Sequence, residues 1–310
     1  MSVTPKLVRS PRTLWNLVDE LSDRAARSML IFRGHEDSAW QLRSGLTRRI
    51  APRPGDRPWD HEKAEAMEAR LLEVYAYHAL RLGKELPKDR WTALALAQHH
   101  GLPTLLLDWS LSPYVALFFA LGGFTGIQSA SHVSLYALSI SALRALESGG
   151  PSSPLELAPK AFACLQVLNP PRHQNRRMIA QEGVFTRPSR IADDIEQHVA
   201  GLMLKFQRNT GTRATPCLTH LKIDGELRTQ ALARLADMGI TPVTMLQDLN
   251  GAALSAIQQV FSTHLDLDKP TTWSFRALAR HSADGSLDCQ RPDSTSSTAP
   301  SAITEDGGEI

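Results

Sequence analysis

The stretch of residues 98–120 constrains the fold most, because it combines the signals of two helices with a short apolar run. A helical run, Trp91–His99, stops before Gly101, and glycine is favoured where a helix ends in the left-handed conformation. Leu105–Leu107 predicts a short strand that is buried on both faces. The run Tyr114–Leu121 is apolar almost all round, which predicts a buried helix.

Polar side chains stand between this strand and the second helix. Asp108, Ser110 and Ser112 precede Pro113, and a serine N-cap followed by proline is a strong helix start signal. A buried strand, a polar corner and a helix N-terminus would form a pocket edge whose free N–H groups suit phosphate or a sugar hydroxyl. The alternative is that Asp108 and Ser110 only satisfy the turn and cap the helix.

An arginine follows an earlier apolar run, Met29–Phe32, which predicts another short strand. Arg33 is the first charged residue after that strand, and Gly34 lets another group approach the backbone closely. A guanidinium fixed there would hold phosphate or carboxylate through two parallel hydrogen bonds. It would equally serve as the partner of an acid such as Asp108, and both interpretations stay open.

Further basic residues form a candidate anion-contacting face. Arg43 follows the first strand, and residues 169–177 form a predicted loop that carries Arg172, Arg176 and Arg177. An ordinary solvated basic loop explains the same pattern.

The segment Met178–Thr186 predicts a late strand with Gln181, Glu182 and Gly183 in its middle. Glycine inside a strand indicates a bulge or the close approach of a ligand.

Helices and strands follow one another without strict βαβ alternation, which predicts an α+β fold rather than a doubly wound sheet. Residues 1–27 are expected to contribute a helix that packs on the main domain, residues 28–262. Residues 263–280 form an extension, and the polar composition of residues 281–310 predicts a disordered acidic tail.

Composition indicates an ordinary globular protein. The net charge of +2 is too small to indicate nucleic-acid binding by itself. Cys164, Cys217 and Cys289 lack metal-ligand spacing, so we expect reduced thiols and no metal. The sequence has no apolar leader and no apolar run of about 18 residues, so we expect a cytoplasmic protein without membrane contact.

The order of these motifs resembles the FRG domain family over roughly residues 28–262. The residues that carry the resemblance are Phe32-Arg33-Gly34, residues 98–120, Asn175-Arg176-Arg177 with residues 180–186, and residues 235–252. Three positions depart from the family pattern: His100 stands where tyrosine is usual, Leu105 replaces a usual arginine, and Ser110 replaces threonine. The loss of that arginine removes one anion contact.

A second likeness concerns mono-ADP-ribosyltransferases of the Arg–Ser–Glu type, because Arg33, Ser110 and Glu182 occur in that order. It implies a mixed, largely antiparallel split β-sheet flanked by helices, with NAD as cofactor. Cleavage of the nicotinamide–ribose bond passes through an oxocarbenium-like state that a carboxylate stabilises. The implied catalytic residues are Glu182, His99, His100 and Ser110, and the implied cofactor-binding residues are Arg33, Gly34, Asp108, Ser112 and Gln181.

These roles have plain alternatives. Histidine is favoured in the last turn of a helix by the helix dipole alone, which accounts for His99 and His100. Glu182 would otherwise be an exposed strand acid.

Two classes of function are the main alternatives, beside a third, a regulatory interaction domain whose acidic tail would mimic or block an anionic ligand. The first is an NAD-dependent ADP-ribosyltransferase-like enzyme, a toxin-like effector of antiviral defence with a protein, RNA or DNA acceptor and a neutralising partner protein. The second is a non-catalytic module that binds a nucleotide or nucleic acid. The enzyme requires that Arg33, Ser110 and Glu182 share one cleft, whereas the binding module does not.

Overall fold

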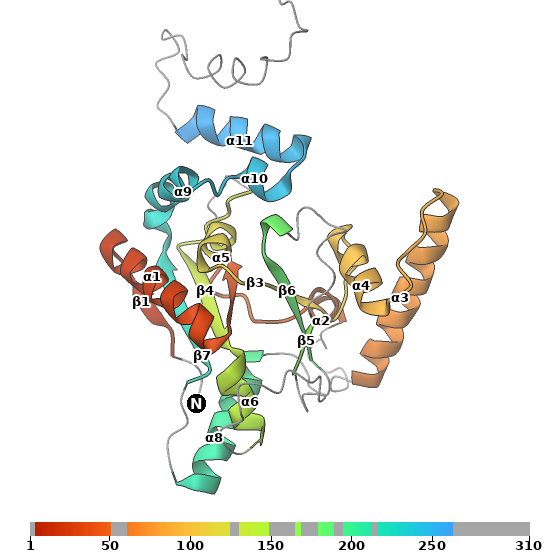
Figure 1. Cartoon of the computed structure of the whole chain (residues 1–310), viewed down its shortest axis with the longest axis horizontal. Coiled ribbons are helices and arrows are strands. Elements are labelled where there is room, and N and C mark those ends of the chain that lie inside the picture. Colours follow the sequence, from red (N-terminus) through yellow and green to blue (C-terminus); the bar gives the residue numbers. More distant parts are fainter. Residues whose placement is uncertain are drawn as a thin grey trace, which may run out of the picture. The chain divides into compact units, whose positions relative to one another are not determined.

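A seven-stranded sheet forms the centre of the computed structural model (Figure 1). The structure describes residues 4–50, 61–124, 130–148, 165–168, 179–188, 195–211 and 216–262. The strands are β1 (Lys6–Val8), β2 (Leu30–His35), β3 (Leu107–Ser110), β4 (His132–Ser139), β5 (Leu165–Leu168), β6 (Gly183–Pro188) and β7 (Leu218–Asp224). The helices are α1 (Pro11–Ser28), α2 (Gly45–Ile50), α3 (His61–Arg81), α4 (Arg90–His99), α5 (Pro113–Ala120), α6 (Ile140–Ser148), α8 (Ile195–Thr210), α9 (Arg228–Asp237), α10 (Pro242–Leu246) and α11 (Leu249–Ser262).

The strand order is β1-β7-β4-β2-β3-β6-β5, and every neighbouring pair is antiparallel except β1 and β7. The predicted α+β fold with a mixed, largely antiparallel sheet flanked by helices is therefore confirmed. The strands form one sheet rather than two separate halves. The two parts of that sheet meet at a single register pair, Phe32 with Ser110.

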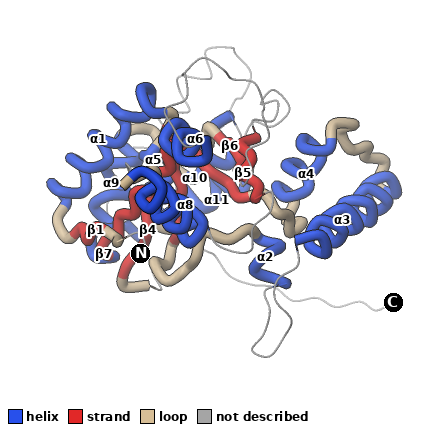
Figure 2. Tube along the Cα trace, turned by 90° about the horizontal axis from the view of Figure 1, so that it is seen from below, coloured by secondary structure: helices blue, strands red, loops and turns tan. Residues whose placement is uncertain are grey.

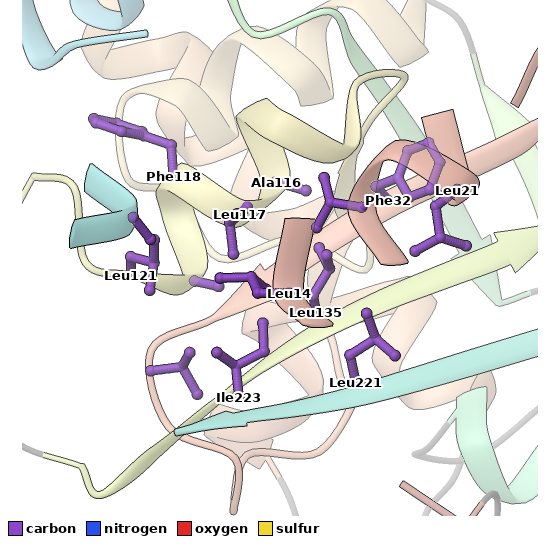
Figure 3. Packing of buried hydrophobic residues seen from close by; sticks show 14 of the residues in the cluster. Leu14, Leu21, Phe32, Ala116, Leu117, Phe118, Leu121, Leu135, Leu221 and Ile223 are labelled. Atoms are coloured by element: carbon purple, nitrogen blue, oxygen red, sulfur yellow. The ribbon is translucent and has the colours of Figure 1, made fainter. Parts of the chain in front are cut away.

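Successive side chains along each strand point to opposite faces of the sheet, and apolar side chains form a core on each face. On one face Phe32, Leu135 and Leu221 pack with apolar residues of α1 and α5, as Figure 3 shows. On the other face Tyr136 and Leu138 pack with α6 and α8. Side chains two positions apart on a strand share a face, so Arg33 and His35 lie on the same side of β2.

The helix start predicted at Ser112 is confirmed, and a serine followed by proline also opens α1 at Ser10. The Ser10 hydroxyl accepts a hydrogen bond from the Thr13 N–H at 3.3 Å at the start of α1. The Ser112 hydroxyl accepts one from the Val115 N–H at 3.3 Å at the start of α5.

The predicted strand Leu105–Leu107 is wrong in its bounds, because β3 spans Leu107–Ser110. The N–H of Leu105 donates instead to a carboxylate oxygen of Glu68 on α3, at 2.7 Å. Leu106 packs against α4, so the two residues leave the sheet for a helical neighbour. The polar residues that were expected at a corner, Asp108 and Ser110, consequently lie on the strand itself.

Other boundaries also differ from the predictions. β2 continues through Arg33 to His35, and β6 begins only at Gly183, so Glu182 precedes the strand. Near the C-terminal end of the described residues, α10 begins with a capping box at Thr241 and with Pro242 in its first turn. That start signal is the same kind as Ser112-Pro113.

The helix α3 is tied to the sheet by a buried ion pair. Figure 2 shows α3 at the outside of the structure, with α4 between it and the strands. Glu68 is fully buried and accepts a hydrogen bond from Arg187 of β6 at 2.9 Å. Burial acts to lower the pKa of Arg187, but the charges and hydrogen bonds of Glu68 and Glu65 outweigh it and raise the pKa.

The glycine of β2 allows α5 to lie directly on the strand. A Cβ on Gly34 would lie 2.1 Å from the carbonyl oxygen of Ala116 and 2.4 Å from the backbone nitrogen of Ala120. These are backbone atoms of α5, so they cannot move aside without shifting the helix. The close approach that the sequence predicted at Gly34 is therefore made by a helix of the protein itself.

We expect Gly34→Ala to destabilise the fold by about 3 kcal/mol, because overpacking against backbone forces the helix to move. The matched control is Gly201→Ala in α8, where no atom lies within 4 Å of the added Cβ. The control should be neutral or stabilise by up to about 1 kcal/mol. Urea unfolding curves of the three proteins test this, and equal midpoints for wild type and Gly34→Ala would contradict the packing described.

Candidate functional site

The sheet has a fork where β2 and β3 stop pairing, between residues 33–35 of β2 and residues 107–109 of β3. β2 pairs with β4 over its whole length, from Leu30 to His35, whereas its only register pair with β3 is Phe32 with Ser110. Past that pair the Arg33 side chain makes the next link, because its Nη1 donates to the carbonyl oxygen of Asp108 at 2.6 Å. A guanidinium thus holds the two strands together at the fork.

A cavity of about 320 Å³ opens at the fork. β2, β3, β6 with the turn before it, α4 and α5 all contribute to its wall. The lining residues are Phe32, Arg33, Gly34, Ala95, Gln98, His99, Asp108, Trp109, Ser110, Ala116, Phe119, Gln181, Gly183, Val184 and Phe185. Arginine, carboxylate and amide groups therefore converge on an otherwise apolar hollow, which is the usual composition of a ligand site.

Arg33 is held through two of its three nitrogens. Its Nε donates to Nε2 of His35 at 2.8 Å, while Nη1 bonds to the Asp108 carbonyl and lies 3.7 Å from a carboxylate oxygen of Asp108. Nη2 has no hydrogen-bond acceptor among the residues that the structure describes. Burial lowers the pKa of Arg33, against the raising effect of Asp108. Arginine nevertheless stays charged at neutral pH.

The hydrogen bonds of His35 define its protonation state. Nε2 accepts from Arg33, so it carries no proton, and Nδ1 lies 3.3 Å from the carbonyl oxygen of Trp40, to which it donates. The ring is almost fully buried. Burial first, and the positive charge of Arg33 second, lower the pKa of His35 from 6.5 to about 3.

A second chain of hydrogen bonds reaches Asp108 from α4. The Thr104 hydroxyl donates to Oε1 of Gln98, and Nε2 of Gln98 donates to Oδ1 of Asp108 at 2.5 Å. The two bonds fix the orientation of the Gln98 amide, because its oxygen accepts and its nitrogen donates. The Asp108 carboxylate is therefore held at the cavity wall although it is largely exposed.

The end of β3 is joined to the turn before β6 by Ser110. Its hydroxyl donates to the carbonyl of Gln181 at 2.8 Å and accepts from the N–H of Ser112 at 3.0 Å. The N–H of Leu111 donates to the carbonyl of Glu182 at 3.0 Å. The Ser110 proton is thus engaged in holding this turn.

Glu182 occupies the turn in a left-handed conformation, with φ of 49°, and is exposed. Its side chain does not line the cavity, whereas its neighbours Gln181 and Gly183 do. Glu182 therefore lies at the rim. Of the three residues that were expected to share one cleft, Arg33 and Ser110 line the cavity and Glu182 does not.

The structure brings six of the predicted site residues to one cavity: Arg33, Gly34, His99, Asp108, Ser110 and Gln181. Three others, besides Glu182, lie elsewhere. Ser112 caps α5, His100 is exposed at the end of α4, and Arg43 is half-buried with an unpartnered Nε. Arg172, Arg176 and Arg177 lie outside the described residues, so their proposed anion contacts stay predictions.

Sequence reasoning missed His35 and Gln98. His35 stands two residues after Arg33, and this spacing would have placed both on one face had the strand been extended past Phe32. Gln98 carries no such signal, because its role depends on a contact between α4 and β3 that only the tertiary fold creates.

Fold and cavity together define an α+β domain with a candidate ligand site at a fork in its sheet. Comparison with known families identifies part of this domain: residues 28–124 match the family model of the FRG domain. The chain therefore contains an FRG domain, and the matched residues include the β2, β3, α4 and α5 walls of the cavity. No curated protein and no solved structure matches the chain. An extent of the domain beyond residue 124 stays a prediction.

Two further findings concern the described part of the chain. No group of three His, Cys, Asp or Glu side chains there could hold a metal ion. None of its helices is long and apolar enough to cross a membrane.

The depressed pKa of His35 predicts how stability depends on pH. Below pH 6.5 the unfolded chain binds a proton at His35, and the folded chain does not until about pH 3. The contribution of His35 to the free energy of unfolding is therefore fully present above pH 6.5, and it falls as the pH drops below that value. This histidine should account for a loss of about 1 kcal/mol between about pH 7 and pH 5.5. Burial also lowers the pKa of His198, which acts in the same direction.

Urea unfolding at the two pH values measures the loss. His35→Gln should show a smaller loss than wild type, while His78→Gln, which replaces an exposed histidine of α3, serves as control and should keep the wild-type loss. An identical pH dependence in wild type and His35→Gln would contradict the buried neutral histidine.

Proposed function

We propose that the cavity at the fork binds the phosphate groups of a nucleotide, with NAD as the leading candidate. The observation that carries the proposal is the state of Arg33. Arg33 lines the cavity, and its guanidinium is fixed through Nε and Nη1 while the N–H donors of Nη2 have no partner within the described structure. A fixed guanidinium with free donors is a strong phosphate ligand, because charge-assisted hydrogen bonds to it need little reorganisation.

The rest of the lining suits the remainder of a nucleotide. Trp109, Phe119 and Phe185 offer apolar surface to a base, and Gln98 with Asp108 offers polar groups to ribose hydroxyls. The volume of about 320 Å³ lies at the lower end of ligand cavities, which span about 300–1,000 Å³. A dinucleotide would therefore place one half inside and extend the other across the rim at Gln181–Gly183.

Isothermal titration calorimetry with NAD and ADP-ribose tests the proposal. Arg33→Ala should weaken binding at least about tenfold, because a hydrogen bond to a charged group contributes about 1.5–3 kcal/mol. Arg33→Lys keeps the charge but loses the planar group that is held at Nε and Nη1, so it should bind with intermediate affinity. Arg24→Ala removes an exposed arginine of α1 and is the control that should bind like wild type.

Circular dichroism verifies that each variant is folded. Failure of the folded wild type to bind either nucleotide, or unchanged affinity in folded Arg33→Ala, would refute the proposal.

A second candidate function is ADP-ribosyl transfer, in which Glu182 would have to act from the rim, because it does not share the cavity with Arg33 and Ser110. Glu182 stands between two lining residues, at the rim that the second half of a dinucleotide would cross. In this reaction the bond between C1′ of the ribose and the nicotinamide nitrogen breaks, and its electron pair leaves with nicotinamide. An acceptor nucleophile then bonds to C1′ and loses its proton. A carboxylate beside the ribose stabilises the positive charge that develops in between.

The two candidates separate in a nicotinamide-release assay. The protein is incubated with labelled NAD, alone and with RNA, DNA or protein acceptors. If transfer occurs, Glu182→Gln should abolish release but leave NAD affinity within about threefold of wild type. Glu226→Gln replaces another exposed acid and is the control. Nucleotide binding without nicotinamide release in any arm would assign the protein to non-catalytic binding modules and exclude the toxin-like role.

A further inference from the structure

We propose that His35 is a positioning residue, which orients the Arg33 guanidinium so that Nη2 is presented to the ligand. This inference rests on the proposed nucleotide site, and it assigns a role to a residue that does not line the cavity. The contact that carries it is the hydrogen bond from Nε of Arg33 to Nε2 of His35, at 2.8 Å.

The bond to His35 restrains the one rotation that the bond to Asp108 leaves free. Nη1 of Arg33 is held by the Asp108 carbonyl across the fork, at 2.6 Å. That contact alone would let the planar group swing about it. A second contact at Nε, on the edge of the guanidinium that Nε shares with Nη2, fixes the plane of the group. Both N–H bonds of Nη2 lie in that plane, so their directions are fixed as well.

His35 is itself held firmly enough to act as a support. Its Nδ1 bonds to the Trp40 carbonyl at 3.3 Å, and its ring meets Tyr136 edge to face at a centroid distance of 5.3 Å. Tyr136 in turn stacks on His220 of β7 at 4.2 Å. Arg33, Tyr136 and His220 are successive cross-strand partners on β2, β4 and β7, so the support extends through three strands.

His220, the last residue of this row, is held by two polar contacts. The Ser134 hydroxyl lies 2.7 Å from Nε2 of His220, and a carboxylate oxygen of Glu196 on α8 lies 3.4 Å from its Nδ1. Ser134 is completely buried and His220 nearly so. The row of side chains behind Arg33 therefore has little room to rearrange.

The charges around His35 keep it in the acceptor form. Burial most strongly, and then the charges of Arg33, Arg48 and His220, disfavour a positive charge on its ring. A protonated ring would lose its lone pair and place two cations in direct contact. The pKa of about 3 therefore keeps the support intact throughout the physiological pH range.

Two substitutions of His35 distinguish the effect of the hydrogen-bond acceptor, Nε2, from the effect of side-chain size. His35→Gln can place an amide oxygen near the position of Nε2, whereas His35→Leu has no acceptor. Calorimetry uses inorganic pyrophosphate and ADP-ribose as probes. His35→Leu should bind both at least about tenfold more weakly, and His35→Gln should remain within about threefold of wild type. Arg33→Ala and Arg24→Ala are carried as the negative and positive controls.

Nitrogen-15 NMR provides a readout that needs no ligand. The Arg33 Nε–H should give a resolved, slowly exchanging signal, and His35 should show an unprotonated Nε2 and a protonated Nδ1. The Arg33 signal should persist in His35→Gln and be lost in His35→Leu. Should His35→Leu fail to fold, the wild-type spectrum and the Gln variant decide the question.

The outcomes distinguish this inference from the function on which it rests. Wild type that binds neither probe would overturn the nucleotide site, and the role of His35 with it. Wild-type affinity in folded His35→Leu, together with lost binding in Arg33→Ala, would overturn the role of His35 alone. A proton on Nε2 of His35 in the wild type would also overturn it, because a protonated nitrogen cannot accept.

Discussion

The structure depends on one side-chain hydrogen bond that takes the place of a backbone hydrogen bond between two strands. Between β2 and β3 the sheet has one register pair, and the next hydrogen bond across the gap comes from the guanidinium of Arg33. Without that link the β3-β6-β5 part would be joined to the rest of the sheet at Phe32 and Ser110 alone. A half-buried cation at such a point must be stabilised by neighbours, because burial disfavours charge. The polar network at the fork follows from that requirement.

Phe32, Arg33 and Gly34 are consecutive residues of β2, and each has a separate physical role. Phe32 is fully buried in the core beneath α1 and α5, Arg33 bridges the fork, and Gly34 lets the backbone of α5 lie against β2. Each role excludes most other residue types. The same short segment therefore sets the helix, the strand junction and the cavity wall, which couples the stability of the domain to the shape of its candidate site.

Local signals in the sequence predicted much of this arrangement. The helix starts at Ser10 and Ser112 were predictable because a hydroxyl cap followed by proline acts within a few residues. The grouping of Arg33, Asp108 and Ser110 was predictable because each occurs beside a buried strand. The bounds of β3 were not, because Leu105 is drawn out of the sheet by Glu68, which is 37 residues away in the sequence. Glu182 was placed inside a strand, since nothing local reveals its left-handed backbone.

The central claim is that the free edge of the Arg33 guanidinium is a phosphate site, and a crystal structure of the protein with ADP-ribose tests it most directly. We expect a phosphate oxygen within hydrogen-bonding distance of Nη2, with the bonds from Nε to His35 and from Nη1 to Asp108 retained. ADP-ribose bound on another surface, or bound in the cavity with its phosphates away from Arg33, would contradict the account.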